Sequence, residues 1–185
     1  MLKAVKRDKK AYMQFTPRNF HNVLNLDIKD GEEVVGEMEL TVIDVFMLMN
    51  NEGVEDLNET ILNQNIAMNL FIDDYLGADY GASLIPHTIS KYDKIFFIQN
   101  YQIFDKYRGR GYSSQGLVAL GKYLIANYLK VNPNILITTC IEPHHFKNND
   151  KKDKKFMVDF YDRNGYTIKE YGVTIVASRE MKKGA

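Results

Sequence analysis

A glycine-rich turn, DKYRGRGYSSQ, joins an apolar stretch to a helical pattern in the second half of the chain. Gly109 and Gly111 lack a Cβ, so an anion can approach the backbone closely. The N–H groups of a first helical turn have no internal acceptors, and the helix dipole adds about half a positive charge there. Lys106, Arg108 and Arg110 add cationic side chains. These residues predict a binding site for a di- or polyphosphate.

Two common nucleotide-binding motifs do not fit this turn. The dinucleotide fingerprint GxGxxG fails because Ser114 stands in place of the third glycine. A P-loop pattern, GxxxxGK, occurs at 116–122, but it lies inside an apolar helical stretch and Tyr123 replaces the required Ser or Thr. A generic nucleotide-binding α/β protein therefore stays as a weaker alternative.

The elements that position this turn follow from hydrophobic periodicity and turn signals. Asp30-Gly31 predicts a hairpin turn between two strands, and Asn132-Pro133-Asn134 ends a long helix. In chain order we expect strands at 11–16, 23–29 and 34–46, acidic amphipathic helices within 55–76, a loop over 77–90, a strand at 94–104, a helix at 112–130, a buried strand at 135–141, a polar loop at 142–155, a helix at 156–163 capped by Asn164-Gly165, and a final hairpin. This order predicts a mixed α/β (α+β) layer fold in a single domain, residues 1–185.

The net charge of zero arises by cancellation of two unlike regions. Residues 30–90 hold 13 acidic residues and no Lys or Arg, whereas the rest of the chain holds all 24 basic residues. The overall balance argues against a nucleic-acid partner, because nucleic-acid binders are basic. The asymmetry indicates two surfaces with different partners, or else a solvated acidic helix.

The compartment is also indicated by composition. A single cysteine, Cys140, excludes a disulfide framework and fits a reducing compartment. The first residues, MLKAVKRDKK, lack the apolar stretch of a signal peptide, and no uncharged apolar run approaches the roughly 20 residues needed to span a bilayer. We therefore expect a cytoplasmic protein without a membrane partner.

The turn and a later segment together resemble one known family. RGRGYS (108–113) resembles the R/Q-x-x-G-x-G/A signature of the GCN5-related N-acetyltransferase (GNAT) superfamily, and FYDRNGY (160–166) resembles its second motif, FYEKLGF. A predicted strand lies between them, and the resemblance covers about 94–178. Ser113 departs from the usual Gly or Ala, and the position of the 55–76 helices differs from the family's order.

The resemblance implies a GNAT-like acyl-CoA acyltransferase fold, with a central twisted mixed sheet flanked by helices, and acetyl-CoA as co-substrate. Residues 94–178 would form the acetyl-CoA-binding half, and residues 1–93 the acceptor half. The cofactor strand would splay at a bulge near Asn100 or Tyr101. Its backbone would then pair with the pantetheine arm through Tyr101, Gln102 and Ile103. The pyrophosphate would lie against Arg108, Gly109, Arg110, Gly111, Tyr112, Ser113 and Ser114.

The resemblance also implies catalytic roles. Tyr161 matches the family's tyrosine, which gives a proton to the leaving thiolate; the alternative is a core aromatic beside Phe160. The first choice for a general base is Glu142, with Glu39 or Glu37 next, although each fits an ordinary surface carboxylate. Cys140, Glu142, His144 and His145 match no zinc spacing, so no metal is expected. The lysines of 147–155 either reach the 3′-phosphate of CoA or are solvated.

Two functions from different classes follow from these residues. The first is an N-acetyltransferase that moves an acetyl group from acetyl-CoA to a primary amine by direct attack. The acidic acceptor half favours a cationic small molecule or peptide as that amine. The second is a non-catalytic acyl-CoA-binding or regulatory module on the same fold. A homodimer is left open.

Overall fold

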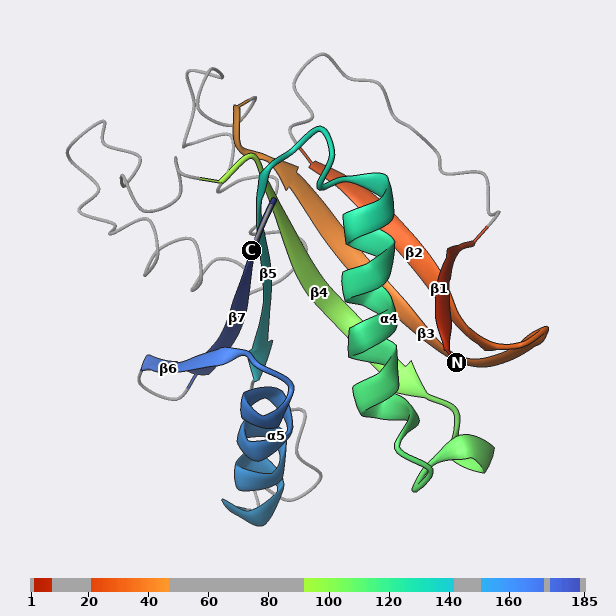
Figure 1. Cartoon of the computed structure of the whole chain (residues 1–185). Coiled ribbons are helices and arrows are strands. Elements are labelled where there is room, and N and C mark those ends of the chain that lie inside the picture. The colour runs from red at the N-terminus through yellow and green to blue at the C-terminus, as the bar shows by residue number, and fades with distance from the viewer. Residues whose placement is uncertain (1, 8–20, 47–91, 142–150, 172–173, 184–185) are drawn as a thin grey trace.

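The computed structural model describes residues 2–7, 21–46, 92–141, 151–171 and 174–183 (Figure 1). The predicted strand at 11–16, the helices within 55–76 and the loop over 77–90 lie outside the described residues, as does Glu142. Within the described ranges the chain folds around one β-sheet.

Seven strands form one sheet in the order β1-β2-β3-β4-β5-β7-β6. Every neighbouring pair is antiparallel except β4 and β5, which are parallel. The strands are β1 (Lys3–Lys6), β2 (His21–Asp30), β3 (Glu33–Asp44), β4 (Lys94–Ile103), β5 (Asn134–Ile141), β6 (Thr167–Tyr171) and β7 (Thr174–Lys182). With helices α4 (Tyr112–Asn127) and α5 (Lys151–Arg163), they confirm the predicted α/β class with a mixed sheet.

The predicted hairpin of β2 and β3 is confirmed. Gly31 adopts a φ of 60°, a conformation that glycine reaches without a steric penalty, at the Asp-Gly turn. Strand β1 was not predicted, because its four residues show no clear alternation of polar and apolar side chains. It forms the edge of the sheet beside β2, and its exposed lysines suit an edge that must stay in water.

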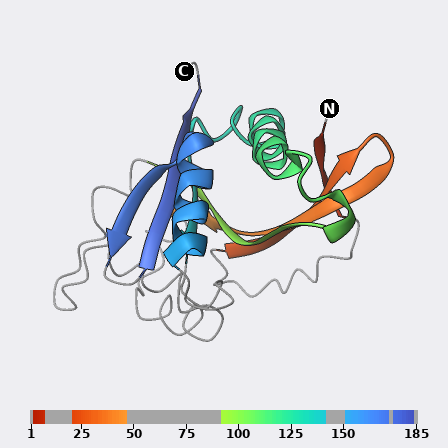
Figure 2. The same ribbon diagram turned by 90° about the horizontal axis from the view of Figure 1, so that it is seen from below.

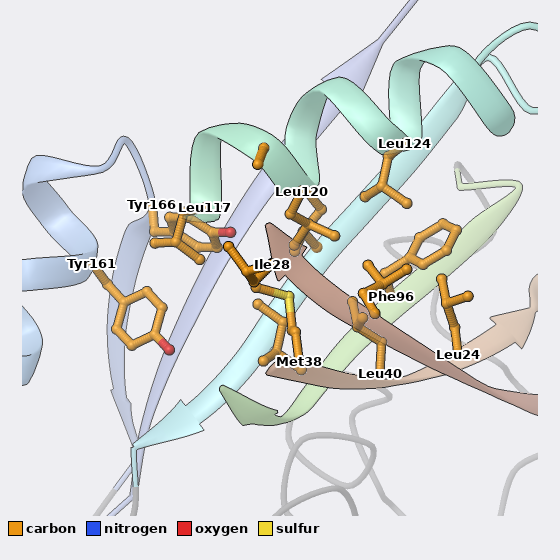
Figure 3. Packing of buried hydrophobic residues seen from close by; sticks show 14 of the residues in the cluster. Leu24, Ile28, Met38, Leu40, Phe96, Leu117, Leu120, Leu124, Tyr161 and Tyr166 are labelled. Carbon is orange, nitrogen blue, oxygen red and sulfur yellow. The ribbon is translucent and has the colours of Figure 1, made fainter. Parts of the chain in front are cut away.

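Helix α4 packs on the arm of the sheet that contains β1 to β4, whereas α5 contacts β5, β6 and β7 (Figures 1 and 2). Figure 2 shows that these two arms of the sheet diverge. In Figure 3, Leu117, Leu120 and Leu124 reach from α4 towards Met38 and Phe96 on the sheet. Tyr161 and Tyr166 close the same buried cluster at the α5 side.

Helix α5 begins at Lys151, five residues before the predicted start, so the prediction of a loop is wrong for residues 151–155; the rest of the predicted loop, 142–150, lies outside the described residues. The lysine-rich segment predicts a loop because it is uniformly polar. Lysine is nevertheless a good helix former, and a solvated first turn needs no apolar stripe. The C-terminal end of the helix, in contrast, is where the sequence predicted it, with Gly165 at a φ of 79°.

Candidate functional site

The turn between β4 and α4 has the conformation that its glycines predict. A short 3-10 helix, η1 (Asp105–Tyr107), leads into Gly109 and Gly111, which both have a φ of 75°. A Cβ at Gly109 would meet nothing within 4 Å, and one at Gly111 would meet only the Gln115 Nε2 atom, at 3.8 Å. The glycines are therefore required by backbone conformation, and the space in front of them is open.

The N-terminus of α4 opens onto this space. Gly111 is the N-cap residue; no side chain caps the helix and no acidic residue lies in its first turn. The first backbone bond of the helix is donated by the Gln115 N–H to the Gly111 carbonyl at 3.2 Å, so the amides of residues 112–114 have no acceptor within the helix. Together with the helix dipole, three free amides fit a phosphate group.

The three cations of the turn have unlike surroundings. The Lys106 Nζ atom lies 3.1 Å from the Glu33 carboxylate, and the Arg108 guanidinium lies 2.9 Å from Asp105. Both ion pairs are largely exposed, so each is weak and can be exchanged for a bound anion. Within the described ranges Arg110 has no carboxylate in an ion pair, and it is exposed beside the free amides.

Strands β4 and β5 separate immediately before the turn. Their parallel pairing runs from Lys94 and Ile135 to Phe97 and Thr138, and then ends. At the next position the Thr139 hydroxyl donates to the Ile98 carbonyl at 3.0 Å. Past this point, no strand in the described part of the chain pairs with β4 on its β5 side. Backbone groups of 99–103 on that side are available to an added strand or an extended ligand, apart from the Ile103 carbonyl, which accepts a hydrogen bond from the Arg108 Nε atom at 3.3 Å.

A bulge accompanies the separation. In the pairing of β3 with β4, Glu39 lies opposite Asn100 while Leu40 lies opposite Ile98, so Gln99 is the extra residue. A bulge was expected at Asn100 or Tyr101, and the structure has it one residue earlier. Because a bulge bends its strand and increases the local twist, it accounts for the divergence of β4 from β5.

The side chains of the predicted pantetheine-pairing residues are already engaged. The Tyr101 hydroxyl donates to the Ser113 carbonyl, and its ring lies against Gly116, where a Cβ would be 2.1 Å from the hydroxyl oxygen. The Gln102 amide donates to the Glu37 carboxylate, and Ile103 is buried. These contacts leave the predicted role to the backbone, as a strand-like ligand would require.

Tyr161 is buried at the separation of the strands, with 4% of its surface exposed. Its ring makes edge-on contacts with Phe160 and Tyr166, at centroid distances of 5.1 and 5.3 Å. Burial raises the pKa of its phenol to about 12, against a partial lowering by a hydrogen bond with Thr139. The phenol is therefore neutral near pH 7, which makes it a proton donor and not a base.

The end of α5 fixes Tyr161 in place. The Tyr166 N–H donates to the Tyr161 carbonyl at 3.1 Å, and the Gly165 N–H donates to the Asp162 carbonyl at 2.9 Å. This pair of bonds is the Schellman motif, in which the residue after the glycine contacts the helix residue five positions earlier. Here the residue after the glycine is Tyr166, and its ring packs against the ring of Tyr161.

Asn164 connects the two motifs, and sequence reasoning had assigned it only a capping role. Its Nδ2 atom donates to the Phe160 carbonyl at 2.7 Å and to the Ser114 hydroxyl at 3.2 Å. Ser114 lies in the free first turn of α4, so the cap of α5 contacts the anion site directly. No sequence signal marks this contact, because it joins residues that are 50 positions apart.

The candidates for a base are only partly described. Glu142, His144 and His145 lie outside the described ranges, as does the side chain of Cys140. Glu37 is engaged by Gln102 and by Arg7, whose guanidinium lies 2.6 Å away. Glu39 is half-buried opposite Asn100 at the bulge. Among the described residues, no group of three or more His, Cys, Asp or Glu side chains could hold a metal ion. No helix in these ranges is both long and apolar enough to span a membrane.

Comparison with known proteins gives likenesses of fold only. No family model matches the chain, and neither does any curated protein. The structure of NAA60 from Arabidopsis thaliana in complex with acetyl-CoA is 13% identical, over 85% of this chain and 76% of that one, with a TM-score of 0.44. A Klebsiella pneumoniae protein assigned as an acyl-CoA N-acyltransferase, without an established activity, is 10% identical over 98% of this chain and 97% of its own, with a TM-score of 0.43.

Proposed function

We propose that this protein is an N-acetyltransferase of the GCN5-related superfamily, which transfers an acetyl group from acetyl-CoA to a primary amine. One observation carries the proposal: β4 and β5 stop pairing beyond Phe97 and Thr138, which leaves an open edge of β4 leading to the glycine turn, and the end of α5, which carries Tyr161, contacts the first turn of α4 through Asn164 and Ser114. The proposed phosphate site, the open edge of β4 and the helix that carries the Tyr161 phenol are thus neighbours in the fold. This is the set of groups that a long, extended thioester with a pyrophosphate needs.

The first part of the proposal concerns the co-substrate. The amides of 112–114 and the exposed Arg110 would bind the pyrophosphate of acetyl-CoA. The free edge of β4 at residues 101–103 would pair with its extended pantetheine arm. The arm would then lead towards Ile98 and Thr139, where the strands join, and so towards the Tyr161 hydroxyl.

The second part concerns the chemistry. The nitrogen lone pair of a neutral amine attacks the thioester carbonyl carbon, a C–N bond forms, and the C–S bond breaks with its electron pair on sulfur. The Tyr161 hydroxyl gives its proton to that thiolate. The tyrosinate regains a proton from the nitrogen, directly or through water, so that the products are an amide, CoA thiol and neutral Tyr161. Glu142 and Glu39 are the candidates for a carboxylate that relays this last proton.

The acceptor that this proposal favours is a cationic amine. Every Lys and Arg of the chain lies outside 30–90, so the acceptor half is acidic by sequence and the half proposed to bind the CoA polyanion is basic. Opposite charge would steer each substrate to its own half. A small polyamine or a Lys-bearing peptide has the required charge.

Binding and transfer can be tested separately. Acetyl-CoA and CoA should raise the melting temperature of the protein more than ATP or NAD at equal concentration, because only a ligand that binds the folded state stabilises it. Stronger stabilisation by ATP or NAD would favour a nucleotide-binding protein instead. Acetyl transfer is then measured as CoA thiol release with a panel of primary amines.

The alternative is a non-catalytic acyl-CoA-binding module. It is favoured by the engagement of Glu37 with Arg7 and Gln102, which makes that carboxylate a poor base. The two functions differ in the panel assay: a binding module is stabilised by acetyl-CoA but releases no thiol with any amine. An enzyme does both.

A further inference from the structure

The tip of the β2–β3 hairpin lies beside the anion turn, residues 108–111, which joins η1 to α4 (Figure 2). A backbone bond leads into this contact. The Phe104 N–H, just past the end of β4, donates to the Val35 carbonyl of β3 at 3.0 Å. The chain therefore stays beside the hairpin as it leaves the sheet and enters η1. Residues of the proposed acceptor half thus border the proposed CoA site.

Two tyrosines on either side of the anion turn are bonded to acidic residues of this hairpin. The Tyr112 hydroxyl donates to the Asp30 carboxylate at 2.8 Å. The Tyr107 hydroxyl donates to the Glu33 carboxylate. Tyr107 is the last residue of η1 and is buried, and Tyr112 is the first residue of α4 and is half-buried. The turn is therefore held at both of its ends by the same hairpin.

The two tyrosines also contact each other. Their ring centroids are 6.2 Å apart with an interplanar angle of 59°, within the usual range of aromatic pairs. The Lys106 Nζ atom lies 4.4 Å from the centroid of the Tyr107 ring and 3.1 Å from the Glu33 carboxylate. The two hydrogen bonds to the hairpin are therefore parts of one connected cluster.

A glycine turn has a specific need for such contacts. Gly109 and Gly111 have more backbone freedom than other residues, so ordering the turn costs more conformational entropy. If the turn became ordered only on binding, the affinity for a phosphate would fall with the fraction of ordered molecules. Contacts that order it beforehand remove this cost. By charge alone, two carboxylates beside an anion site would weaken phosphate binding. Their benefit must come from the groups they hold.

We propose that Asp30 and Glu33 are positioning residues, which hold the anion turn in its phosphate-binding conformation through Tyr112 and Tyr107. This inference rests on the proposed function, and it gives the acceptor half a part in binding the co-substrate. Because Tyr112 is the first residue of α4, its anchored ring fixes the start of the helix. The direction of the three free amides is fixed with it.

The binding test compares tyrosines of one helix. Tyr112→Phe keeps the ring and removes the bond to Asp30, so the dissociation constant for acetyl-CoA should rise about fivefold, the factor of one ordinary hydrogen bond. Inorganic pyrophosphate, which has no pantetheine arm, should lose affinity by about the same factor. The matched control is Tyr123→Phe, since Tyr123 is half-buried on α4 and its ring contacts Tyr128. It should keep both affinities. Unchanged affinities in Tyr112→Phe would overturn the inference.

Two substitutions of Asp30 separate its bond from its charge. Asp30→Asn and Asp30→Ala both remove the charge, but only asparagine keeps an acceptor oxygen for the Tyr112 hydroxyl. Asp30→Ala should therefore bind acetyl-CoA about fivefold more weakly than Asp30→Asn. In a Tyr112→Phe background the two should bind alike, and a difference that persists there would contradict the positioning role. If the Asp30 variants do not fold, the comparison of Tyr112→Phe with Tyr123→Phe decides the question.

Hydrogen exchange tests the inference without ligand or activity. The Gln115 N–H donates to the Gly111 carbonyl at 3.2 Å and so closes the first turn of α4. In the free protein this amide should exchange faster in Tyr112→Phe and at the wild-type rate in Tyr123→Phe. Equal rates in all three proteins would overturn the inference. A wild-type protein that binds acetyl-CoA but releases no thiol with any amine overturns the transferase function instead, and weaker acetyl-CoA binding by Tyr112→Phe would still support the positioning role.

Discussion

At the scale of single residues, the protonation of Tyr161 sets what the site can do. Burial raises its pKa to about 12, and the bond with Thr139 offsets part of that rise. The group must be protonated to act as an acid, so activity would be lost only as the pH rises through this value. The phenol therefore keeps its proton throughout the neutral range, and a base has to come from another residue or from water.

Replacing Tyr161 by Phe should lower kcat about 100-fold, the lower end of the usual contribution of a general acid. The affinity for CoA should hardly change, because the ring and its packing stay. In the wild type, the plot of kcat against pH should show no fall caused by Tyr161 until the pH approaches about 12. Steady-state kinetics and calorimetric titration with CoA measure both quantities.

Tyr128→Phe is the control for this variant. Tyr128 is also a partly buried tyrosine, but it follows the far end of α4, where its ring contacts Phe96 at a centroid distance of 4.9 Å. Tyr128→Phe should leave kcat unchanged. An unchanged kcat in Tyr161→Phe would contradict the acid role.

Asn164→Asp tests the contact between the two motifs. The substitution removes the Nδ2 donor and keeps the side-chain shape, so the bond to the Phe160 carbonyl is lost and a negative charge lies beside the Ser114 hydroxyl at the proposed anion site. We expect the dissociation constant for acetyl-CoA to rise several-fold, together with a loss of about 1 kcal/mol in the free energy of unfolding. Both are measurable by ligand titration and urea denaturation.

Asn127→Asp provides a matched control. The Nδ2 atom of Asn127 donates to the Tyr123 carbonyl at 2.8 Å, the same bond across four residues that Asn164 makes to Phe160. Asn127 lies at the C-terminal end of α4, away from the anion turn. Equal loss of acetyl-CoA affinity in the two variants would show that Asn164 affects only helix stability.

At the scale of elements, the local turn signals predicted the parts of the site that depend on short-range geometry. Asn164-Gly165 predicted the end of α5, and the Schellman motif there places Tyr161 against Tyr166. Asp30-Gly31 predicted the β2–β3 turn in the same way. Each of these signals works because only a few residues can adopt a positive φ without strain.

Gly111→Ala tests the turn as an element. A φ of 75° costs an alanine about 1–2 kcal/mol of stability, although the added Cβ meets no atom closer than 3.8 Å. We expect this loss in urea denaturation. Because strain is relieved by moving the turn, we also expect weaker binding of acetyl-CoA.

Gly31→Ala is the control that separates the loss of stability in Gly111→Ala from the loss of acetyl-CoA binding. Gly31 has a φ of 60° and nothing within 4 Å of an added Cβ, so its strain is similar, but it lies in the β2–β3 turn. It should lose stability and keep its affinity for acetyl-CoA. If both variants keep that affinity, the turn does not bind the pyrophosphate.

Long-range contacts limited what could be predicted from the sequence. Strand β1 has too few residues to show a period, and its assignment depends on pairing with β2. The bulge lies at Gln99, whereas the sequence predicted it at Asn100 or Tyr101. The register with β3 decides which residue is extra. The bond from Thr139 to the Ile98 carbonyl had no recognisable signal, since it exists only where β4 and β5 meet.

At the scale of the whole molecule, the structure shows which acidic residues of the 30–90 segment are already paired with other side chains. Glu33 and Asp44 form ion pairs with Lys106 and Lys94, at 3.1 and 2.7 Å, and Asp30 accepts from the Tyr112 hydroxyl at 2.8 Å. Glu33 and Asp44 are thus partly neutralised by lysines on other elements, and the Asp30 carboxylate is engaged in a hydrogen bond. The charge available to a cationic acceptor must come mainly from the other acids of that segment.

The charge hypothesis predicts a salt dependence. At equal concentration, kcat/KM should be higher for a diamine or triamine than for a monoamine of similar length. The advantage should shrink as ionic strength rises, because salt screens attraction between exposed charges. A monoamine that is used best at all salt concentrations would contradict the acidic acceptor surface.

The separation of β4 from β5 also affects how the free protein behaves in solution. An unpaired strand edge is a template for pairing with another chain, and natural sheets usually cover or charge such edges. Among the described strands, none pairs with β4 past Ile98 on that side. Protein without ligand should therefore aggregate faster on mild heating than protein saturated with acetyl-CoA. Light scattering over time measures this, and equal rates would mean that the edge is already protected.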